Sequence, residues 1–397
     1  MQTRIQSIDI FRGLTILTMV FVNDLAGVRD IPAWMKHAVE GSNSMTFVDV
    51  VFPAFLFIVG MSIPLALQRR RANGVSSAAL WAHVLVRFAG LLVLGLFMVN
   101  ISRLNPELTG MDRHVWSTLF FLGTIAVWSQ PGDIQGGKRV AWRLVRIGGV
   151  VLILILAAVY RSGDAANPGW MHTQWWGILG LIGWTYLVCS AAFLLIGANI
   201  PALTALLGLS VCLYIGDKSG SLAFLGPVSN VLWIGGHIGG HASIALAGMI
   251  AGLTFGPSSP ASTPKNKILW LTGMAAILAI AGYLLGPLYG ISKNSATPAW
   301  SLYSAAICCL VFLLLYWVSD LRQRGHWFTI AEPAGANPLL AYLLPDIFYG
   351  ALAIVGLEHL WGAMGSGFGG ILRSIFFSLA IVWLTGHLTR LGLRLKL

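Results

Sequence analysis

A histidine and a carboxylate lie beside two strongly apolar stretches near the start of the chain. His37 belongs to the run Lys-His-Ala-Val-Glu that ends at Glu40, and Asp49 closes the run Met-Thr-Phe-Val-Asp, between apolar stretches at 10–28 and 47–67. An imidazole can take a proton near neutral pH or carry an acyl group, and a carboxylate can orient it and stabilise its cation. Polar groups at membrane depth are costly, so both residues are functional candidates.

Two further roles follow from the residue types around this pair. The amide of Asn23 can donate its N–H to a developing oxyanion. The carboxylate of Asp49 can alternatively cap the helix expected to start at Val50, and the capping and orienting roles are compatible. From residue types alone, His37 can equally be an ordinary loop histidine, so the choice of His37, Asn23 and Asp49 as catalytic residues rests on a resemblance to a known family.

Composition assigns the chain to the membrane proteins. Of the 397 residues, 57% are hydrophobic and 10% are charged, with a mean hydropathy of +0.78. Soluble domains contain about 25% charged residues. A separate soluble domain of ordinary size has no room in this chain. We therefore expect a single integral-membrane domain over residues 1–397.

Apolar runs predict an all-α, polytopic transmembrane bundle. We count about twelve helices, with ten or eleven as alternatives, because roughly 20 helical residues cross the hydrocarbon core. The short, glycine-flanked runs 201–216 and 241–255 can also be broken or re-entrant helices. The runs lie at 10–28, 47–67, 80–100, 114–130, 143–160, 175–196, 201–216, 241–255, 268–287, 300–318, 337–353 and 371–389.

Basic residues set the expected orientation in the membrane. With both termini cytoplasmic, roughly two thirds of the 25 lysines and arginines fall in inside loops, as the positive-inside rule requires. The net charge of +11 then reflects topology and contact with anionic lipids, and we expect no nucleic-acid partner. This orientation places His37 and Asp49 on the outer side of the membrane.

Several segments resemble the family of heparan-α-glucosaminide N-acetyltransferase and its bacterial relatives. The densest similarity lies in residues 7–13, 19–23, His37 and 48–60, with weaker similarity in residues 291–294, 297–300 and 335–342. The Met-Thr-Phe-Val-Asp run is similar to that of a bacterial branch. Members of that branch resemble acyltransferases and have also been described as amino-sugar-related transporters.

The resemblance implies an acetyltransferase of the bacterial cytoplasmic (inner) membrane. Acetyl-CoA would bind from the cytoplasm as co-substrate, and a glucosamine-type amino sugar on the periplasmic side would accept the acetyl group. His37 matches the family's catalytic histidine, Asn23 its membrane-embedded asparagine partner, and Asp49 the aspartate that opens the next helix. The family's Trp-Asn-Gly element after the histidine is replaced here by residues 40–44, a departure that concerns the acceptor side.

Arginines are the expected ligands of the coenzyme A phosphates, because a guanidinium binds phosphate oxygens bidentately. Arg12 is the first candidate, since Asp9 lies three residues earlier on the same helical face and can hold it beside the cofactor. The pair can equally be structural. The other candidates, each of which can instead set topology or contact lipid, are Arg69, Arg70, Arg71, Arg143 and Arg146.

Polar residues outside the first spans are candidates for binding the acceptor. His241 and His237 have the i, i+4 spacing of a zinc site, but glycines flank both and a third ligand is missing, so we predict no metal. Asn337 either lines a pore or caps the helix expected from Pro338. The predicted acceptor-binding residues are Glu40, His241, Ser243, Lys293 and Asn337.

Two functions from different classes stay open at this stage. One is the acetyltransferase, with an amino sugar, acetyl-CoA and membrane lipids as partners, and a homodimer is compatible with it. The other is a carrier of an N-acetylglucosamine-type sugar without chemistry, in which His37 and Asp49 bind substrate or proton. Matched residues gather around one histidine, which favours the enzyme, since carriers more commonly show two related halves with polar residues at the midplane.

Overall fold

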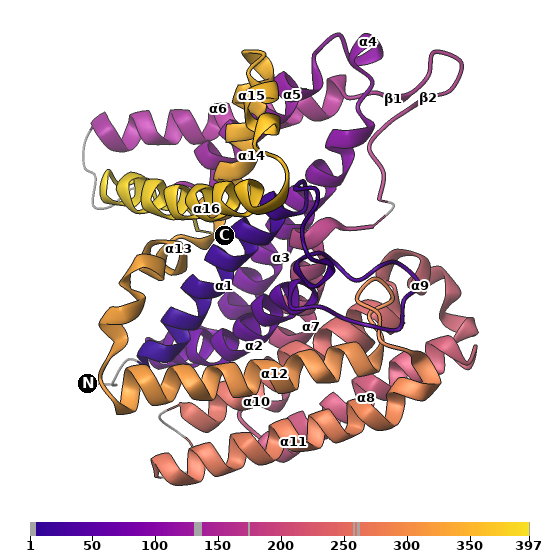
Figure 1. The fold of residues 1–397 in the computed structure, drawn as a ribbon, viewed down its shortest axis with the longest axis vertical. Helices are drawn as coiled ribbons and strands as arrows, with labels where there is room; N and C mark the ends of the chain where they lie inside the picture. Colours follow the sequence, from indigo (N-terminus) through magenta and orange to yellow (C-terminus); the bar gives the residue numbers. More distant parts are fainter. Residues whose placement is uncertain (1–4, 131–136, 174, 257–258, 260–262, 397) are drawn as a thin grey trace. The chain divides into compact units, whose positions relative to one another are not determined.

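The computed structural model describes residues 5–130, 137–173, 175–256, 259 and 263–396 (Figure 1). In these residues the regular secondary structure is helical apart from one antiparallel ribbon, in which Ser162 pairs with Gly169 and Gly163 with Pro168. The helices belong to two compact units built from alternating segments. The first unit is Met1–Thr15, Pro32–Phe88 and Leu181–Thr329, and the second is Ile16–Ile31, Ala89–Gly180 and Ile330–Leu397.

The first unit contains α2 (Val48–Ala72), α8 (Ile200–Lys218), α9 (Gly226–Leu232), α10 (Ala242–Phe255), α11 (Pro264–Tyr289) and α12 (Pro298–Tyr316), with the 3-10 turns η1 (Ala33–Met35) and η3 (Ala223–Leu225) and the π-helical turns η4 (Ile234–His241) and η5 (Trp317–Leu321). The second unit contains η2 (Ile101–Arg103), α4 (Pro106–Thr109), α5 (Arg113–Trp128), α6 (Gly137–Val159), β1 (Ser162–Gly163), β2 (Pro168–Gly169), α13 (Glu332–Ala336), α14 (Pro338–Ile354), α15 (Glu358–Ala363) and α16 (Gly367–Arg390). Four elements contribute residues to both units: α1 (Gln6–Leu25), α3 (Ser77–Asn100), α7 (Gly177–Ile196) and η6 (Gly325–Ala331).

The chain is a helical membrane protein. Within the described residues, nine helices are long and apolar enough to cross a bilayer: Val48–Ala72, Ser77–Arg103, Lys138–Val159, Gly177–Ile196, Ile200–Lys218, Ile234–Phe255, Pro264–Tyr289, Pro298–Leu321 and Gly367–Arg390. Each coincides with one of the apolar runs in the sequence. The runs 201–216 and 241–255 are therefore continuous helices, and the alternative of broken helices there is wrong.

The other three expected spans differ from this set for identifiable reasons. The run 337–353 forms α14, which meets the helical stretch Gly325–Ala336 at an angle of 75° and so makes either one bent span or two separate segments. The run 114–130 forms α5, whose 16 residues are fewer than the roughly 20 that cross hydrocarbon. The run 10–28 forms α1, which carries charged residues near both of its ends. A count of twelve and cytoplasmic termini stay predictions.

The core of the first unit is a close backbone contact between α2 and α10. A Cβ on Gly60 of α2 would overlap the carbonyl of Ala245, and a Cβ on Gly248 of α10 would overlap the carbonyl of Phe57. Gly252 lies one turn further along α10 and approaches α2 in the same way. Small residues allow membrane helices to approach this closely. Every residue of α10 is buried as a result.

The core of the second unit contains a charged cluster around Asp24 of α1. Its carboxylate accepts hydrogen bonds from the hydroxyls of Tyr349 and Ser374, each at 2.6 Å, and from the indole N–H of Trp361 at 3.2 Å. Nη2 of Arg373 completes the shell at 3.1 Å. The Arg373 and Asp24 side chains are 7% and 2% exposed, so this is a buried ion pair whose anion is fully hydrogen-bonded.

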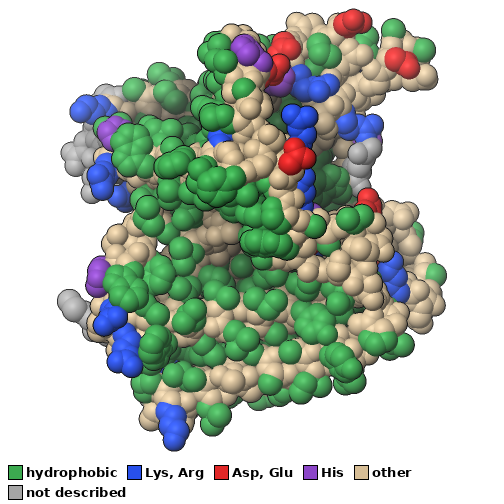
Figure 2. Space-filling view, viewed as in Figure 1, with side chains coloured by type: hydrophobic (Ala, Val, Ile, Leu, Met, Phe, Trp, Pro, Cys, Tyr) green, Lys and Arg blue, Asp and Glu red, His purple; other side chains and the backbone are tan. Residues whose placement is uncertain are grey.

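Apolar side chains cover outward-facing parts of the first unit. Leu269, Ile277 and Tyr283 of α11 and Leu310 and Leu314 of α12 are all more than half exposed. Figure 2 shows hydrophobic side chains spread over this region, with lysines and arginines gathered towards one end of the helices. An extended apolar face of this kind matches a helix surface in contact with lipid.

Candidate functional site

The loop before α2 is folded around the carboxylate of Asp49. Asp49 is the second residue of α2, and its side chain is 3% exposed. Oδ2 accepts the backbone N–H groups of Ala38 and Thr46, both at 3.0 Å, and the Thr46 hydroxyl donates to the carbonyl of Lys36 at 2.7 Å. These donors precede the helix, so the carboxylate fixes the loop that carries His37. The N-cap of α2 is Phe47, which makes no side-chain capping bond, but Asp49 places its charge in the first turn, as the alternative of a capping charge predicted.

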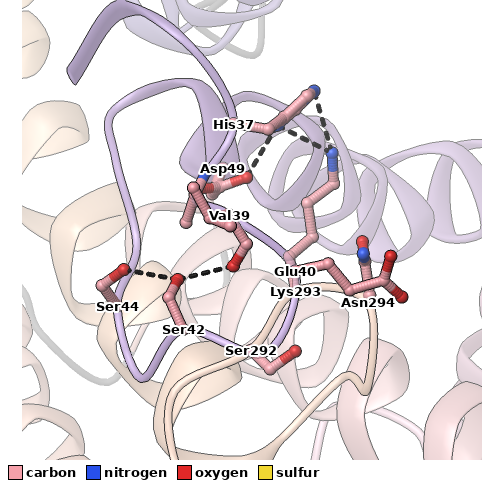
Figure 3. A pocket seen from close by; sticks show the side chains of 10 residues that line it. His37, Val39, Glu40, Ser42, Ser44, Asp49, Ser292, Lys293 and Asn294 are labelled. Carbon is pink, nitrogen blue, oxygen red and sulfur yellow. Dashed lines mark hydrogen bonds and ion pairs between the residues drawn. The ribbon is translucent and has the colours of Figure 1, made fainter. Parts of the chain in front are cut away.

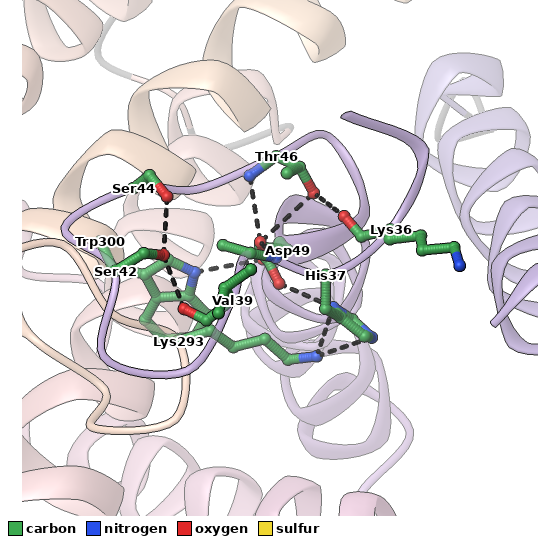
Figure 4. A network of polar contacts seen from close by, with 10 residues as sticks. Lys36, His37, Val39, Ser42, Ser44, Thr46, Asp49, Lys293 and Trp300 are labelled. Atoms are coloured by element: carbon green, nitrogen blue, oxygen red, sulfur yellow. Dashed lines mark hydrogen bonds and ion pairs between the residues drawn. The ribbon is translucent and has the colours of Figure 1, made fainter. Parts of the chain in front are cut away.

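His37 and Asp49 form a direct pair. Nδ1 of His37 lies 2.7 Å from Oδ1 of Asp49, and the imidazole is 46% exposed (Figure 4). Because a carboxylate faces Nδ1, that nitrogen carries the hydrogen of the neutral ring, and the lone pair is on Nε2. The predicted orienting role of Asp49 has the geometry it requires. Nε2 is therefore the nitrogen suited to accept a proton or an acyl group.

Lys293 reaches His37 from the loop between α11 and α12. Its Nζ lies 3.3 Å from Nδ1 and 3.3 Å from Nε2 of the imidazole (Figure 3). Asn43 ties the two loops together by accepting the N–H of Ile291 at 2.7 Å. Burial lowers the pKa of Lys293, and the negative charge of Asp49 partly opposes that shift. The structure thus brings together two residues that the sequence separates by more than 250 positions.

The side chains of His37, Asp49 and Lys293 line a small polar cavity. Its volume is about 150 Å³. It is lined by His37, Ala38, Val39, Glu40, Ser42, Ser44, Asp49, Ser292, Lys293 and Asn294 (Figure 3). A volume of this size has room for several water molecules, and so for an amine and an acetyl group. Of the predicted acceptor-binding residues, Glu40 and Lys293 line it.

An aromatic layer packs behind the pair. The indole N–H of Trp300 donates to the backbone carbonyl of Asp49 at 3.2 Å, and His241 packs edge-on against Trp300 with ring centroids 6.0 Å apart. His241 is 2% exposed and stacks on His237 at 5.9 Å. The hydroxyl of Ser243 donates to a backbone carbonyl one turn earlier. The predicted residues His241 and Ser243 therefore lie in the packed layer, and the cavity lining does not include them.

Two predicted asparagines belong to the second unit. Asn23 is exposed and lines a different cavity, of about 410 Å³, so the structure does not assign it to the cavity of His37. Asn337 donates to the Thr389 hydroxyl at 3.0 Å and to the carbonyl of Leu393 at 2.9 Å, and it accepts the N–H of Leu395 at 3.1 Å. Its amide thus holds the C-terminal segment, and its side chain makes no capping bond to α14.

Arg12 makes the ion pair that the sequence predicted. Its Nη1 lies 3.1 Å from Oδ1 of Asp9, and its Nη2 donates to the hydroxyl of Ser62 in α2, also at 3.1 Å. Since a helix rises 1.5 Å per residue, Ser62 is about 20 Å along α2 from Asp49. Arg12 is thereby fixed in the first unit, between the His37 end of α2 and its arginine-rich end.

The remaining predicted arginines are solvent-exposed. Arg69 and Arg70 lie in the last turn of α2, about 30 Å along the helix from Asp49. Arg143 and Arg146 lie on α6 in the second unit, and the guanidinium of Arg146 stacks over the Trp142 ring at 5.6 Å. Exposed guanidinium groups at helix ends suit both phosphate binding and contact with lipid headgroups.

The sequence did not single out Thr46 and Trp300 as site residues. Thr46 lies three positions before Asp49, a spacing at which the two side chains can share a turn, so its role was readable in principle. Trp300 lies in a segment with weak family similarity, but its hydrogen bond to Asp49 joins residues about 250 positions apart and could not be predicted. Apolar runs rich in tryptophan look alike whether the ring faces lipid or a site.

Together, the fold and this cluster define a polytopic helical membrane protein with a histidine–aspartate–lysine site at the N-terminal end of a membrane-spanning helix. Residues 4–167, which include His37 and Asp49, match the model of a family described as a domain of unknown function, DUF5009. A stretch of 98 residues is 38% identical to heparan-alpha-glucosaminide N-acetyltransferase of Homo sapiens and 37% identical to that of Mus musculus. The stretch covers 24% of this chain and 14% of each relative. The resemblance predicted from the sequence motifs is confirmed.

Proposed function

We propose that this chain is a transmembrane acetyltransferase of a bacterial inner membrane. It takes the acetyl group from acetyl-CoA bound from the cytoplasm and transfers it to a glucosamine-type amino sugar on the periplasmic side. The observation that supports this most directly is the His37 imidazole, whose Nδ1 is fixed by Asp49 at 2.7 Å and which lines a cavity of about 150 Å³. The similarity to N-acetyltransferases over 98 residues gives the reaction class.

The residues of the cavity can carry out acyl transfer to an amine. Nε2 of His37 accepts the proton of the attacking amine and returns it to the departing sulfur, so that an N–C bond forms as the C–S bond breaks. Asp49 keeps the imidazole in the tautomer with a basic Nε2 and stabilises its cation. The same nitrogen can instead carry the acetyl group in a two-step route, because imidazole is also an acyl acceptor.

We expect the nucleotide of acetyl-CoA to be held away from this cavity, because the donor binds from the cytoplasm while the charge bias places His37 on the outer side. Arg12 is the best placed of the predicted arginines in the first unit, since it contacts α2 about 20 Å from Asp49, whereas Arg69 and Arg70 are about 30 Å away. Its guanidinium is already oriented by Asp9 and Ser62. A pre-oriented guanidinium suits a phosphate oxygen.

Replacing Arg12 with alanine is expected to weaken acetyl-CoA binding by about 1.5–3 kcal/mol, because a charge-assisted contact to phosphate is lost. Titration calorimetry on the purified protein measures it. Ser62→Ala, which removes only the second contact of Arg12, is the matched control and should have the smaller effect. Binding of acetyl-CoA to Arg12→Ala with wild-type affinity would mean that the Asp9–Arg12 pair is only structural.

A cysteine at Glu40 is expected to react with a membrane-impermeant thiol reagent in intact cells, whereas a cysteine at Arg70 is not. Glu40 precedes α2 and Arg70 lies in its last turn, and the charge bias places Arg70 inside. The background protein should carry Cys212→Ser, because Cys212 is the exposed one of the four native cysteines. Reversed labelling would put the proposed acceptor site in the cytoplasm and exclude transfer across the membrane.

Assays in proteoliposomes distinguish the acetyltransferase hypothesis from the carrier hypothesis. Vesicles loaded with radiolabelled acetyl-CoA and supplied with glucosamine outside should release labelled N-acetylglucosamine to the outside. A parallel experiment with radiolabelled glucosamine measures its accumulation inside. Accumulation of unmodified sugar inside the vesicles, with no acetylation, would reject the acetyltransferase and support the carrier.

A further inference from the structure

We infer that Lys293 is an internal acyl acceptor: when no amino sugar occupies the cavity, the acetyl group passes to Nζ of Lys293 and blocks the site. This inference rests on the proposed function. It makes Lys293 a modification site and not only a residue of the cavity wall. The consequence is an enzyme that inactivates itself when it has donor but no acceptor.

The position of Nζ is what an acceptor amine requires. A primary amine must lie within hydrogen-bond reach of the base that removes its proton. Nζ lies 3.3 Å from Nε2 of His37, and Lys293 lines the same cavity as the imidazole (Figure 3). The amino group of glucosamine and the ε-amino group of lysine are both primary amines. An acetyl group delivered to His37 therefore meets the lysine amine wherever the sugar amine is absent.

The loop around Lys293 keeps the amine in place. Ser292 donates its backbone N–H to the Thr297 hydroxyl at 3.0 Å, and Ile291 is tied to Asn43 of the opposite loop. Ala296 adopts a positive φ of 47°, which closes this turn tightly. A fixed amine loses little entropy when it reacts, so its effective concentration at the reacting carbon is high.

Burial favours the neutral, nucleophilic form of the amine, because it lowers the pKa of Lys293. In the reaction, the Nζ lone pair attacks the thioester carbonyl carbon, the N–C bond forms and the C–S bond breaks. The proton of Nζ passes to Nε2 of His37 and then to the coenzyme A sulfur. The products are N-acetyl-lysine and the thiol. An amide does not donate its acetyl group onward, so the modified protein is trapped.

Lys36 provides an internal control for this chemistry. It is the residue next to His37 in sequence, yet its side chain extends away from the imidazole (Figure 4). The two lysines therefore share the same protein, donor and pH and differ in their position relative to His37. Preferential modification of Lys293 over Lys36 that is lost in His37→Ala would report the site geometry, because burial by itself already increases the fraction of neutral Lys293 amine.

The test uses the purified full-length protein, incubated with acetyl-CoA without glucosamine and analysed by peptide mass spectrometry. Lys293 should be acetylated at least about tenfold faster than Lys36. His37→Ala should slow the modification of Lys293 by roughly 10²-fold, and added glucosamine should protect it. Preincubation with acetyl-CoA should progressively lower the transfer rate of wild type relative to its own starting rate, and Lys293→Arg should resist that decline.

Two outcomes distinguish failure of this inference from failure of the proposed function. If glucosamine is acetylated while Lys293 stays unmodified in its absence, the inference is overturned and the acetyltransferase stands. If acetyl-CoA acetylates neither glucosamine nor Lys293, the experiment is repeated with p-nitrophenyl acetate as the acetyl donor. Faster acetylation of Lys293 than of Lys36 by this donor, with the midpoint of the rate–pH profile at a lower pH for Lys293, would then support Lys293 as acceptor and reject acetyl-CoA as donor. Equal modification of both lysines would overturn the inference.

Discussion

His37→Ala is expected to lower acetyl transfer to glucosamine by roughly 10²- to 10⁴-fold, the range typical of losing acid–base catalysis. Acetyl-CoA binding should stay near the wild-type value, because the proposed nucleotide site lies at the cytoplasmic end of the protein and not at His37. The proteoliposome assay gives the rate, and calorimetry gives the affinity. His326→Ala, which removes an exposed histidine outside the cavity, is the matched control.

Asp49→Asn should reduce the rate less than His37→Ala, because the imidazole remains while its orientation and the stabilisation of its cation are impaired. An asparagine also presents one acceptor oxygen where Asp49 presents two, so it cannot hold both His37 and the N–H groups of Ala38 and Thr46. Acetylation at the wild-type rate by His37→Ala would remove the catalytic role of that residue. A larger loss for Asp49→Asn than for His37→Ala would make loop anchoring the dominant contribution.

Arg373→Ala is expected to destabilise the protein by about 3–5 kcal/mol, the cost of leaving one partner of a buried ion pair without the other. Asp24 would keep the hydroxyl and indole donors but would have no counter-charge, at a side-chain exposure of 2%. The loss of the Arg373 guanidinium also removes its contact over the Trp361 ring at 4.9 Å. Reversible unfolding in detergent micelles measures the difference.

Two further variants isolate the charge effect. Arg29→Ala removes an exposed arginine that lines the 410 Å³ cavity, which Asp24 and Arg373 also line. It should change the free energy of unfolding little. The double variant Asp24→Asn with Arg373→Met removes both charges, and it should be more stable than Arg373→Ala. If Arg373→Ala and the double variant lose the same stability, the unpaired charge of Asp24 is not the cause of the loss.

Most of the helices could be predicted from the sequence, because a run of about 20 apolar residues has few alternatives to a spanning helix. The run 47–67 corresponds to α2, and 268–287 corresponds to α11. The bend between Ala336 and Pro338 was not predicted, since hydropathy reports length and not direction. The His37–Asp49 pair was predicted because the two residues are neighbours in sequence and match a motif.

Contacts between distant segments could not be predicted. The sequence marked Lys293 as a candidate but gave no sign that it touches His37, because the two loops meet only after α11 and α12 have packed. Nothing in the sequence pairs Arg373 with a counter-charge. Arg373 lies inside α16, where Asp24, 349 positions earlier, neutralises it. When its partner is far away in the sequence, a buried, paired charge cannot be distinguished by sequence from a solvent-exposed charge.

The close contact of α2 with α10 also constrains how the protein is made. Ribosomes deliver α2 to the membrane nearly 200 residues before α10, so the face of α2 that carries Gly60 stays in lipid without its partner until α10 is inserted. Helix association after insertion fits this order, and contacts of such long sequence separation form slowly. During that interval the unpaired α2 presents a surface that another copy of the chain can occupy. Translation must therefore continue through α10 before α2, which carries Asp49, is fully packed. Truncation before residue 242 would leave α2 without α10.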